Sequence, residues 1–277
     1  MALVLGLAAA VGLVVWQGAG DVVRALAGAG WEVVGVVVLW IVPLTLATEA
    51  WRVLFPHDRP LGHAFALHAS WVGFGVNWLL PVAMVGGEAA KVRLMHRRGM
   101  DAGLGAATVV VDKTVQVGTQ VLFALLGLAL LGARYAGGEI VLPAAVAVVL
   151  LSVGTWAFYR IQMRGLFGAL AGALERLLPG SLPGEPLEVD PSSVDRTVHE
   201  IYRDPGRWAR SLAWRMGFRV IWAGEVWLAL RLLGHPVGVV EALIVESLGQ
   251  AGRAAGFLIP GGLGAQEGAV MAAGAAV

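Results

Sequence analysis

The chain lacks cysteine and contains few charged residues. None of its 277 residues is cysteine and 14% are charged, whereas 58% are hydrophobic. The lack of cysteine excludes disulfides, thiolate metal sites and cysteine nucleophiles. Long apolar stretches recur from end to end and leave no room between them for a soluble domain of ordinary size. The composition therefore predicts a polytopic, all-α integral membrane protein.

Several motifs of soluble enzymes are also missing. The six histidines do not show HExxH or a similar metal-binding spacing, and the chain contains no P-loop and no nucleophile constellation. We therefore expect no resident metal or cofactor, no direct use of ATP and no enzymatic activity. Acid–base chemistry by carboxylates and a lysine in one groove is the enzymatic alternative.

Residues 77–98, NWLLPVAMVGGEAAKVRLMHRR, contain a break. An apolar run is interrupted at Pro81 and at Gly86 and Gly87, and a charged helix follows. Proline removes a backbone donor, and glycine permits a sharp change of direction. Such a break is tolerated in a bilayer only where protein or a water-filled cavity satisfies the freed backbone groups. We predict a re-entrant hairpin at 63–98, with a full crossing as the alternative.

The same pattern occurs again 179 residues later. The pairs that match at this offset, without gaps, are Gly73 and Gly252, Leu79 and Leu258, Pro81 and Pro260, Glu88 and Glu267, and Arg52 and Arg231. The second break consists of Pro260, Gly261 and Gly262. The pattern predicts an internal repeat with a second hairpin at 239–277. Chance is the alternative, because glycine and proline are common in membrane helices.

Five apolar runs are near or above the ~20 residues that a spanning helix requires. They cover residues 2–19, 31–54, 104–132, 139–159 and 208–233. The first run lacks a positively charged leading region, so we interpret it as a membrane helix rather than a cleaved signal. The sequence thus predicts about five full spans and two re-entrant hairpins.

Lysine and arginine are distributed unequally between the two predicted faces. One face carries twelve: Arg52, Arg59, Lys91, Arg93, Arg97, Arg98, Arg160, Arg164, Arg176, Arg196, Arg203 and Arg207. The other carries three: Arg24, Arg134 and Arg231. This asymmetry predicts that the first face and the N-terminus are cytoplasmic. The hairpins then enter from opposite sides, which predicts an inverted-topology repeat, an arrangement found in transporters.

The predicted organisation has two membrane halves, 1–159 and 208–277, joined by a cytoplasmic linker at 160–207. Within the linker, leucine spacing predicts an interfacial helix at 164–178. Asp190 and Pro191 are typical of a helix start, and this second helix should end before Pro205. Because only ten residues follow Glu267, we expect the second half to be truncated here or completed by a partner chain.

Ionisable residues inside spans cost about 2.5–3.5 kcal/mol each at the helix centre, so they tend to pair or face water. Spacing places Glu246, Gln250 and Arg253 on one helical face, and it pairs Glu88 with Lys91. Asp112 and Lys113 point about 100° apart and need different partners. The predicted substrate-binding residues are Glu88, Lys91, Asp112, Lys113, Glu246, Gln250, Arg253 and Glu267.

Several of these residues also have a purely structural interpretation. Glu88 and Glu267 could complement a helix dipole after the break. Asp112 and Lys113 could form structural ion pairs with another helix. Arg253 favours function more strongly, because a guanidinium beside a re-entrant loop can hold a phosphate bidentately.

The breaks carry a family resemblance. NWLLP, GGE, the step from Asp112 to Lys113, and GRAAGFLIPGGLGAQEG together resemble the flippase-like membrane domain of lysylphosphatidylglycerol synthetases. The stretch 252–268 is most similar to hopanoid-biosynthesis-associated membrane proteins. The resemblance covers about residues 40–277 and implies a bacterial inner-membrane protein that moves lipids between leaflets. The lysyl-transferring proteins carry a cytosolic acyltransferase-like domain that this sequence lacks, so aminoacyl-lipid synthesis is not expected.

The resulting functional prediction is translocation of an anionic phospholipid or a hopanoid-type lipid. The main alternative is an accessory protein that binds a lipid without moving it, and an ion-coupled transporter of a small solute is another. The expected partners are membrane lipids, a lipid-biosynthesis enzyme or a second copy of the chain, and not nucleic acid.

Overall fold

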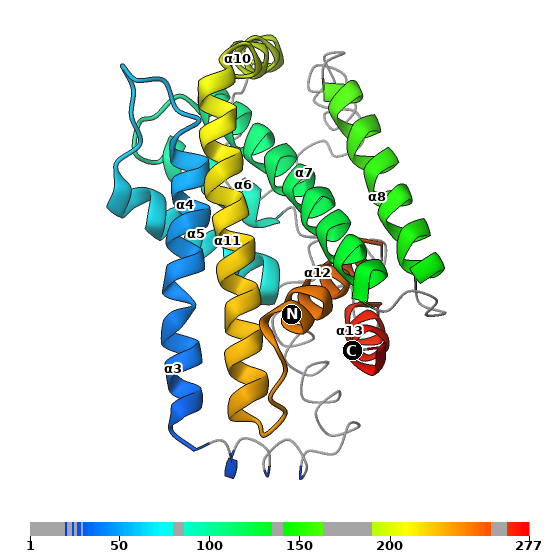
Figure 1. Cartoon of the computed structure of the whole chain (residues 1–277). Helices are drawn as coiled ribbons and strands as arrows, with labels where there is room; N and C mark the ends of the chain where they lie inside the picture. Colours follow the sequence, from blue (N-terminus) through cyan, green and yellow to red (C-terminus); the bar gives the residue numbers. More distant parts are fainter. Residues whose placement is uncertain are drawn as a thin grey trace.

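The computed structural model describes residues 20, 24, 27–28, 30–79, 86–134, 141–162, 190–255 and 265–276. All regular structure within these residues is helical, which confirms the predicted all-α fold for this part of the chain (Figure 1). The predicted helices at 2–19 and 164–178, and the breaks at Pro81 and at 260–262, lie outside the described residues.

The four predicted apolar runs that begin at or after residue 31 correspond to five helices of the described residues, because the first run contains two helices. They are α3 (Glu32–Leu39), α4 (Ile41–Arg52), α7 (Ala102–Arg134), α8 (Val141–Gln162) and α11 (Pro205–Leu232). Helices α3 and α4 meet at Trp40, whose backbone N–H donates to the carbonyl oxygen of Val36. Pro43 follows in the first turn of α4 and has no backbone N–H to donate. Among the described residues, two helices are long and apolar enough to cross a membrane, Val34–Arg52 and Ala102–Arg134.

Helix α11 lies between α4 and α7 and fixes their register (Figure 1). It runs antiparallel to α4, with Gly217 packed against Leu46. It runs parallel to α7, because Arg215 contacts Asp112 and the next turn of α11 contacts the next turn of α7. Where these two helices touch, residues of α7 and α11 that lie side by side are therefore 103 positions apart in the sequence.

Helices α5 (His63–Leu79) and α6 (Gly86–His96) form an antiparallel pair. Gly73 and Gly87 allow close approach, because a Cβ at Gly87 would collide with the carbonyl oxygen of Gly73. The backbone N–H of Gly87 donates to Asn77 Oδ1 at 2.8 Å. The amide side chain thus caps the start of α6, where the sequence placed the second part of the break.

Helices α12 (Val239–Ala255) and α13 (Ala265–Ala276) form a second pair. This pair packs on the end of α7 through a buried apolar cluster. The members of that cluster are Leu131, Ile244, Val245, Leu248 and Ala273. The starts of α6 and α13, at residues 86 and 265, are separated by 179 residues, which is the offset of the sequence repeat.

The two pairs join the bundle at opposite ends. At one end, Trp51 Nε1 donates to Thr108 Oγ1 at 3.3 Å, so the end of α4 meets the start of α7. The α5–α6 pair lies between these two helices in sequence and returns to that end. At the other end, Arg134 closes α7 and pairs with Glu241 in the first turn of α12. The α12–α13 pair therefore enters from there.

Helix α10 (Pro191–Arg203) begins and ends as the sequence predicted. Asp190 accepts a hydrogen bond from the backbone N–H of Ser192 at 3.0 Å and caps the helix. Hydrogen bonds from the Ser192 hydroxyl and N–H hold the pKa of Asp190 below its usual value. Val194, Val198 and Ile201 are buried against α7 and hold the connection on the bundle.

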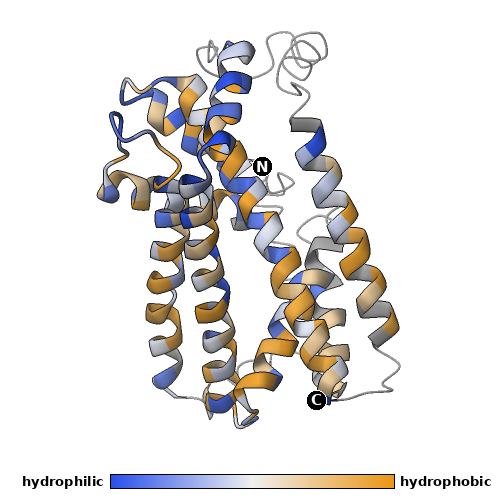
Figure 2. Cartoon of the chain, turned by 45° about the horizontal axis from the view of Figure 1, so that its top comes forward, coloured by the Kyte–Doolittle hydropathy of each residue, from blue (hydrophilic) through white to orange (hydrophobic). Residues whose placement is uncertain are grey.

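Many apolar side chains lie on the outside of the helical bundle, and several charged side chains lie inside it. Figure 2 shows long hydrophobic stretches along the outer helices. Val37 on α3 and Leu150 on α8 are 70% and 64% exposed, whereas Asp112 and Arg215 are 2% and 3% exposed. This is the distribution expected of a protein whose outer surface faces lipid.

Candidate functional site

Four of the predicted residues meet where α6 packs on α7. Lys113 Nζ lies 3.0 Å from Glu88 Oε1, and Lys91 Nζ lies 3.4 Å from Glu88 Oε2. Lys91 Nζ is also 3.9 Å from Asp112 Oδ2. The predicted pairing of Glu88 with Lys91 is confirmed, as is the prediction that Asp112 and Lys113 have different partners.

Arg215 of α11 is the principal partner of Asp112, and the sequence analysis did not include it in the site. Its Nη2 donates to both carboxylate oxygens of Asp112, at 2.7 and 2.6 Å, and its Nε donates at 3.2 Å. A bidentate arginine–carboxylate pair is among the strongest side-chain interactions and fixes both side chains. The available sequence signal was a charged residue inside an apolar run, which requires a partner.

Local structure explains why Glu88 lies at the centre of this group. Gly86 and Gly87 start α6, so Glu88 occupies the first helical turn, where it complements the helix dipole. One carboxylate oxygen also accepts a hydrogen bond from Lys113 of α7, and the other forms an ion pair with Lys91 of α6. The structural interpretation of Glu88 and its membership of a polar site are therefore compatible.

We name Glu88, Lys91, Asp112, Lys113 and Arg215 the cationic group. Its three cations and two carboxylates leave one positive charge in excess. It borders a cavity of about 30 Å³, which has room for roughly one or two waters. The cavity is lined by Gly73, Phe74, Asn77, Glu88, Lys91, Lys113, Gln116 and Arg215.

A second group lies where α11 packs on α12. We name Arg219, Glu225 and Glu246 the acidic group, because it contains two carboxylates and one cation. All three side chains are at least 94% buried, with exposures of 5%, 5% and 6%. Gln250 Nε2 donates to Glu246 Oε1 at 2.8 Å, which confirms the predicted common face of these two residues.

The two groups are neighbours on α11. Arg219 is one turn after Arg215, and the two guanidinium charges interact. Arg219 Nη2 donates to the carbonyl oxygen of Gln116, which also lines the cavity. Five of the eight predicted substrate-binding residues therefore fall in two adjacent polar groups, and a sixth, Gln250, donates a hydrogen bond to Glu246 of the acidic group. Arg253 and Glu267 lie on α12 and α13, and their side chains are outside the described part of the structure.

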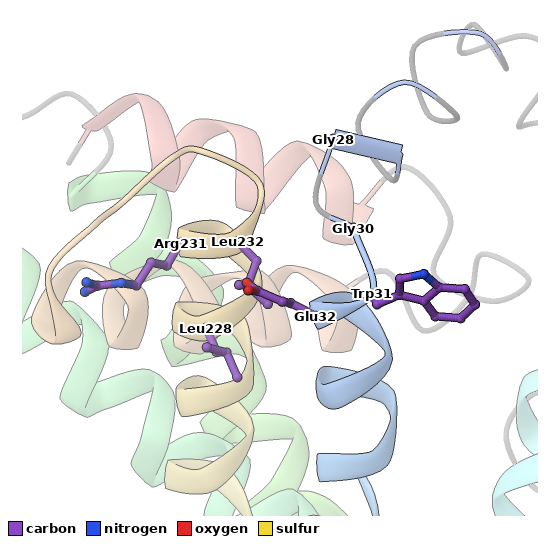
Figure 3. Close-up of a pocket in the computed structure, with 7 residues that line it drawn as sticks. All are labelled: Gly28, Gly30, Trp31, Glu32, Leu228, Arg231 and Leu232. Carbon is purple, nitrogen blue, oxygen red and sulfur yellow. The ribbon is translucent and has the colours of Figure 1, made fainter.

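A larger depression lies at the far end of α11. It measures about 710 Å³ and lies between the start of α3 and the end of α11. Figure 3 shows Trp31 pointing away from both helices and Arg231 extending to the side away from α3. None of the predicted substrate-binding residues lines it. Within the described residues, no group of three or more histidines and carboxylates is arranged to hold a metal ion.

Comparison with known families assigns the chain. The family described as "Lysylphosphatidylglycerol synthase TM region" matches residues 3–277. Comparison with curated proteins and with solved structures found no match. The family match spans almost all of the chain and agrees with its apolar exterior. The chain belongs to the lysylphosphatidylglycerol synthase transmembrane family and is a membrane protein related to lipid metabolism.

Proposed function

We propose that the chain binds the headgroup of an anionic lipid at the cationic group and moves it between the leaflets of the bacterial inner membrane. The observation that carries this proposal is a group with one excess positive charge inside an apolar exterior, in which Lys91, Asp112 and Arg215 are buried. A buried charge is costly unless it is compensated, so an anionic ligand is favoured here.

The charge balance favours an anionic phospholipid over a neutral hopanoid-type lipid. A phosphate placed beside Lys113 and the free Nη1 of Arg215, which has no hydrogen-bond partner among the described residues, would accept charge-assisted hydrogen bonds. The lipid tails would stay against the exposed apolar side chains of the outer helices.

The helix pairs support a transporter architecture. The α5–α6 pair joins the bundle at the end where α4 meets α7, and the α12–α13 pair joins it at the end where α7 meets α12. Both pairs then act as re-entrant hairpins that enter from opposite sides, as inverted-topology repeats do. In this arrangement the N-terminus is cytoplasmic, as the lysine and arginine asymmetry predicts.

The described conformation is the closed state in this proposal. A cavity of about 30 Å³ holds water but not a headgroup. The α5–α6 contact at Gly73 and Gly87 brings backbone close to backbone, with the side chains of Asn77 and Lys91 packed beside it. In this proposal α6 moves at that contact. Such a movement would open the cationic group toward one leaflet and keep α7 and α11 in place.

The test is leaflet exchange of fluorescent phosphatidylglycerol in proteoliposomes. We expect exchange with the unmodified protein and about a tenfold or greater loss with Lys113→Met, because a hydrogen bond to a charged group contributes about 1.5–3 kcal/mol. Arg134→Met is the matched control, since it removes a cation from the end of the same helix, away from the cavity. Equal exchange by both variants would contradict the proposal.

An accessory lipid-binding protein of a biosynthetic complex is the second candidate, and the closed cavity favours it. In that case the purified protein would bind phosphatidylglycerol, Lys113→Met would weaken this binding, and the unmodified protein would not exchange lipid in vesicles. Co-purification with a lipid-biosynthesis enzyme would then support the accessory role.

A further inference from the structure

Three buried N–H donors on α7 and α11 have no acceptor. Within the described part of the chain, Arg215 Nη1, Arg219 Nε and Gln120 Nε2 make no hydrogen bond. Their side chains are 3%, 5% and 6% exposed, respectively. A buried donor without an acceptor costs free energy, so each such group in a native protein requires an explanation. A ligand that brings several acceptor oxygens, such as a phosphate group, would satisfy all three donors.

These donors follow one line along the two helices. Arg219 lies one turn after Arg215 on α11, and Gln120 lies one turn after Gln116 on α7. The two helices are in register there, because Arg219 Nη2 donates to the carbonyl oxygen of Gln116 at 3.1 Å. Arg215 and Gln116 also line the cavity of the cationic group. The line of free donors therefore begins at that cavity and continues along both helices away from it.

The two guanidinium groups lie on the same side of α11. Their Cζ atoms are 6.0 Å (Arg215) and 5.7 Å (Arg219) from the centre of the Phe218 ring, and their charges interact. Like charges buried beside each other repel, so an anion between them stabilises both. The charge of Glu246 on α12 also acts on Arg219, and the Nε–H nevertheless lacks an acceptor. Glu225 lies six residues after Arg219, which is about 120° away around the helix.

The line crosses the middle of both helices. Helix α7 covers Ala102–Arg134, so its midpoint is residue 118, and Gln116 and Gln120 lie on either side of it. Helix α11 covers Pro205–Leu232, so its midpoint is between residues 218 and 219, beside Arg219. An ionisable side chain is most costly at the centre of a spanning helix, and such residues mark substrate pathways by default.

We propose that Arg219 and Gln120 form a second headgroup site, to which the lipid phosphate passes from the cationic group. The inference rests on the proposed function and deepens it, because it defines the step that follows binding. At the first site the phosphate accepts hydrogen bonds from Lys113 and from Nη1 of Arg215. At the second site it accepts them from Arg219 Nε and Gln120 Nε2. No covalent bond changes in this step.

The spacing of the donors suits a stepwise movement. Successive levels are one helical turn apart, about 5.4 Å, so the phosphate can leave one level while it reaches the next. Its charge then keeps N–H donors in a core where an unpaired charge is costly. The cavity of about 30 Å³ borders Lys113 and Arg215, and neither Arg219 nor Gln120 lines it. Initial binding should therefore not require the second site, whereas movement should.

The test combines two measurements on the full chain. Isothermal titration with dihexanoyl phosphatidylglycerol in detergent measures binding, and leaflet exchange of fluorescent phosphatidylglycerol in proteoliposomes measures movement. Arg219→Met should bind within about twofold of the unmodified protein and exchange about tenfold more slowly or worse, because a charge-assisted hydrogen bond is lost. Lys113→Met should lose both activities. Arg231→Met is the matched control, since it removes a cation from the last turn of the same helix, and it should change neither.

Gln120→Leu tests the second site without a change of charge. It replaces an unpartnered donor by an apolar side chain of similar size, so the melting temperature should not fall. Exchange should slow by about threefold to tenfold, because one neutral hydrogen bond to the phosphate is lost. If Gln120 only fills space, exchange will stay at the rate of the unmodified protein.

The outcomes separate the two proposals. Exchange at the unmodified rate by folded Arg219→Met and by Gln120→Leu would overturn the second site and leave the proposed lipid site intact. A loss of binding in Arg219→Met as large as in Lys113→Met would place Arg219 in the first site and also overturn the inference. An unmodified protein that does not bind or does not exchange the lipid would overturn the proposed function, and the second site with it. If Arg219→Met does not fold, Gln120→Leu decides, since slower exchange supports the second site and unchanged exchange overturns it.

Discussion

The α5–α6 and α12–α13 pairs have the same antiparallel arrangement but are held together differently. In the first pair, Gly73 lies against the Lys91 side chain, and a Cβ there would be 3.0 Å from Lys91 Cε. In the second pair, Gly249 lies against Val270, which follows Lys91 by the repeat offset of 179. One pair therefore packs a charged side chain at a position where the other packs an apolar one.

The difference separates folding requirements from functional ones. The second pair shows that apolar packing is sufficient for this geometry, with Ile244 and Ala273 fully buried. A buried ion pair is often no more stabilising than apolar residues of the same volume. A charged side chain at the position of Lys91 is thus not needed to form a helix pair, which supports a ligand-binding role for Lys91.

The largest expected effect comes from breaking the Asp112–Arg215 pair, which anchors the charged region. Arg215→Met leaves a buried carboxylate without its bidentate partner, and Lys91, at 3.9 Å, is too distant to replace it. We expect a loss of about 3–5 kcal/mol in the free energy of unfolding. Unfolding in mixed detergent measures it.

The control is the double variant Asp112→Asn with Arg215→Met, which removes both charges. It should recover most of the lost stability, because no uncompensated charge remains. Additive losses in the double variant would show that the two residues stabilise the protein independently and would contradict the ion-pair account.

The apolar region should respond to cavity formation instead. Ile244→Ala removes a fully buried side chain beside Leu131 and Ala273, with an expected loss of about 2–5 kcal/mol. Lipid binding per folded molecule should be unchanged, because this apolar cluster shares no residue with the cationic group or the lining of its cavity. The control is Met271→Ala on α13, whose side chain is 74% exposed, and a similar loss from it would contradict the packing argument.

A smaller effect is expected from closing the space between α5 and α6. Gly87→Ala adds a Cβ against the carbonyl oxygen of Gly73 and forces the helices apart, at a cost of about 1–3 kcal/mol. Gly118→Ala is the matched control, because open space surrounds that position of α7. Thermal unfolding should distinguish the two, and equal melting temperatures would show that the glycine contact does not determine the pairing.

Local rules predicted part of this site. Residue spacing correctly paired Glu88 with Lys91 and Gln250 with Glu246, because neighbours three or four residues apart share a helical face. It also separated Asp112 from Lys113. The Asp190 cap and Pro191 fixed the start of α10 for an equally local reason.

Contacts between distant helices could not be predicted in the same way. Arg215 pairs with Asp112 across 103 residues, and this depends on the register of α7 against α11. Asn77 caps Gly87 across ten residues, and helical spacing alone does not predict this contact. Helical periodicity gives the face on which a side chain lies, but tertiary packing decides what that face meets.

The smallest expected effect concerns the ion pair at the end of the bundle where α7 meets α12. Arg134 is 53% exposed and pairs with Glu241, in contrast to the fully buried Asp112–Arg215 pair. Arg134→Ala should lower the free energy of unfolding by at most about 1 kcal/mol, because solvent and salt screen exposed pairs. Raising the salt concentration should reduce the difference between Arg134→Ala and the unmodified protein while leaving the loss in Arg215→Met almost unchanged. If salt instead reduced the Arg215→Met loss as strongly, the Asp112–Arg215 pair would be accessible to water. The distinction between this buried pair and the exposed Arg134–Glu241 pair would then be wrong.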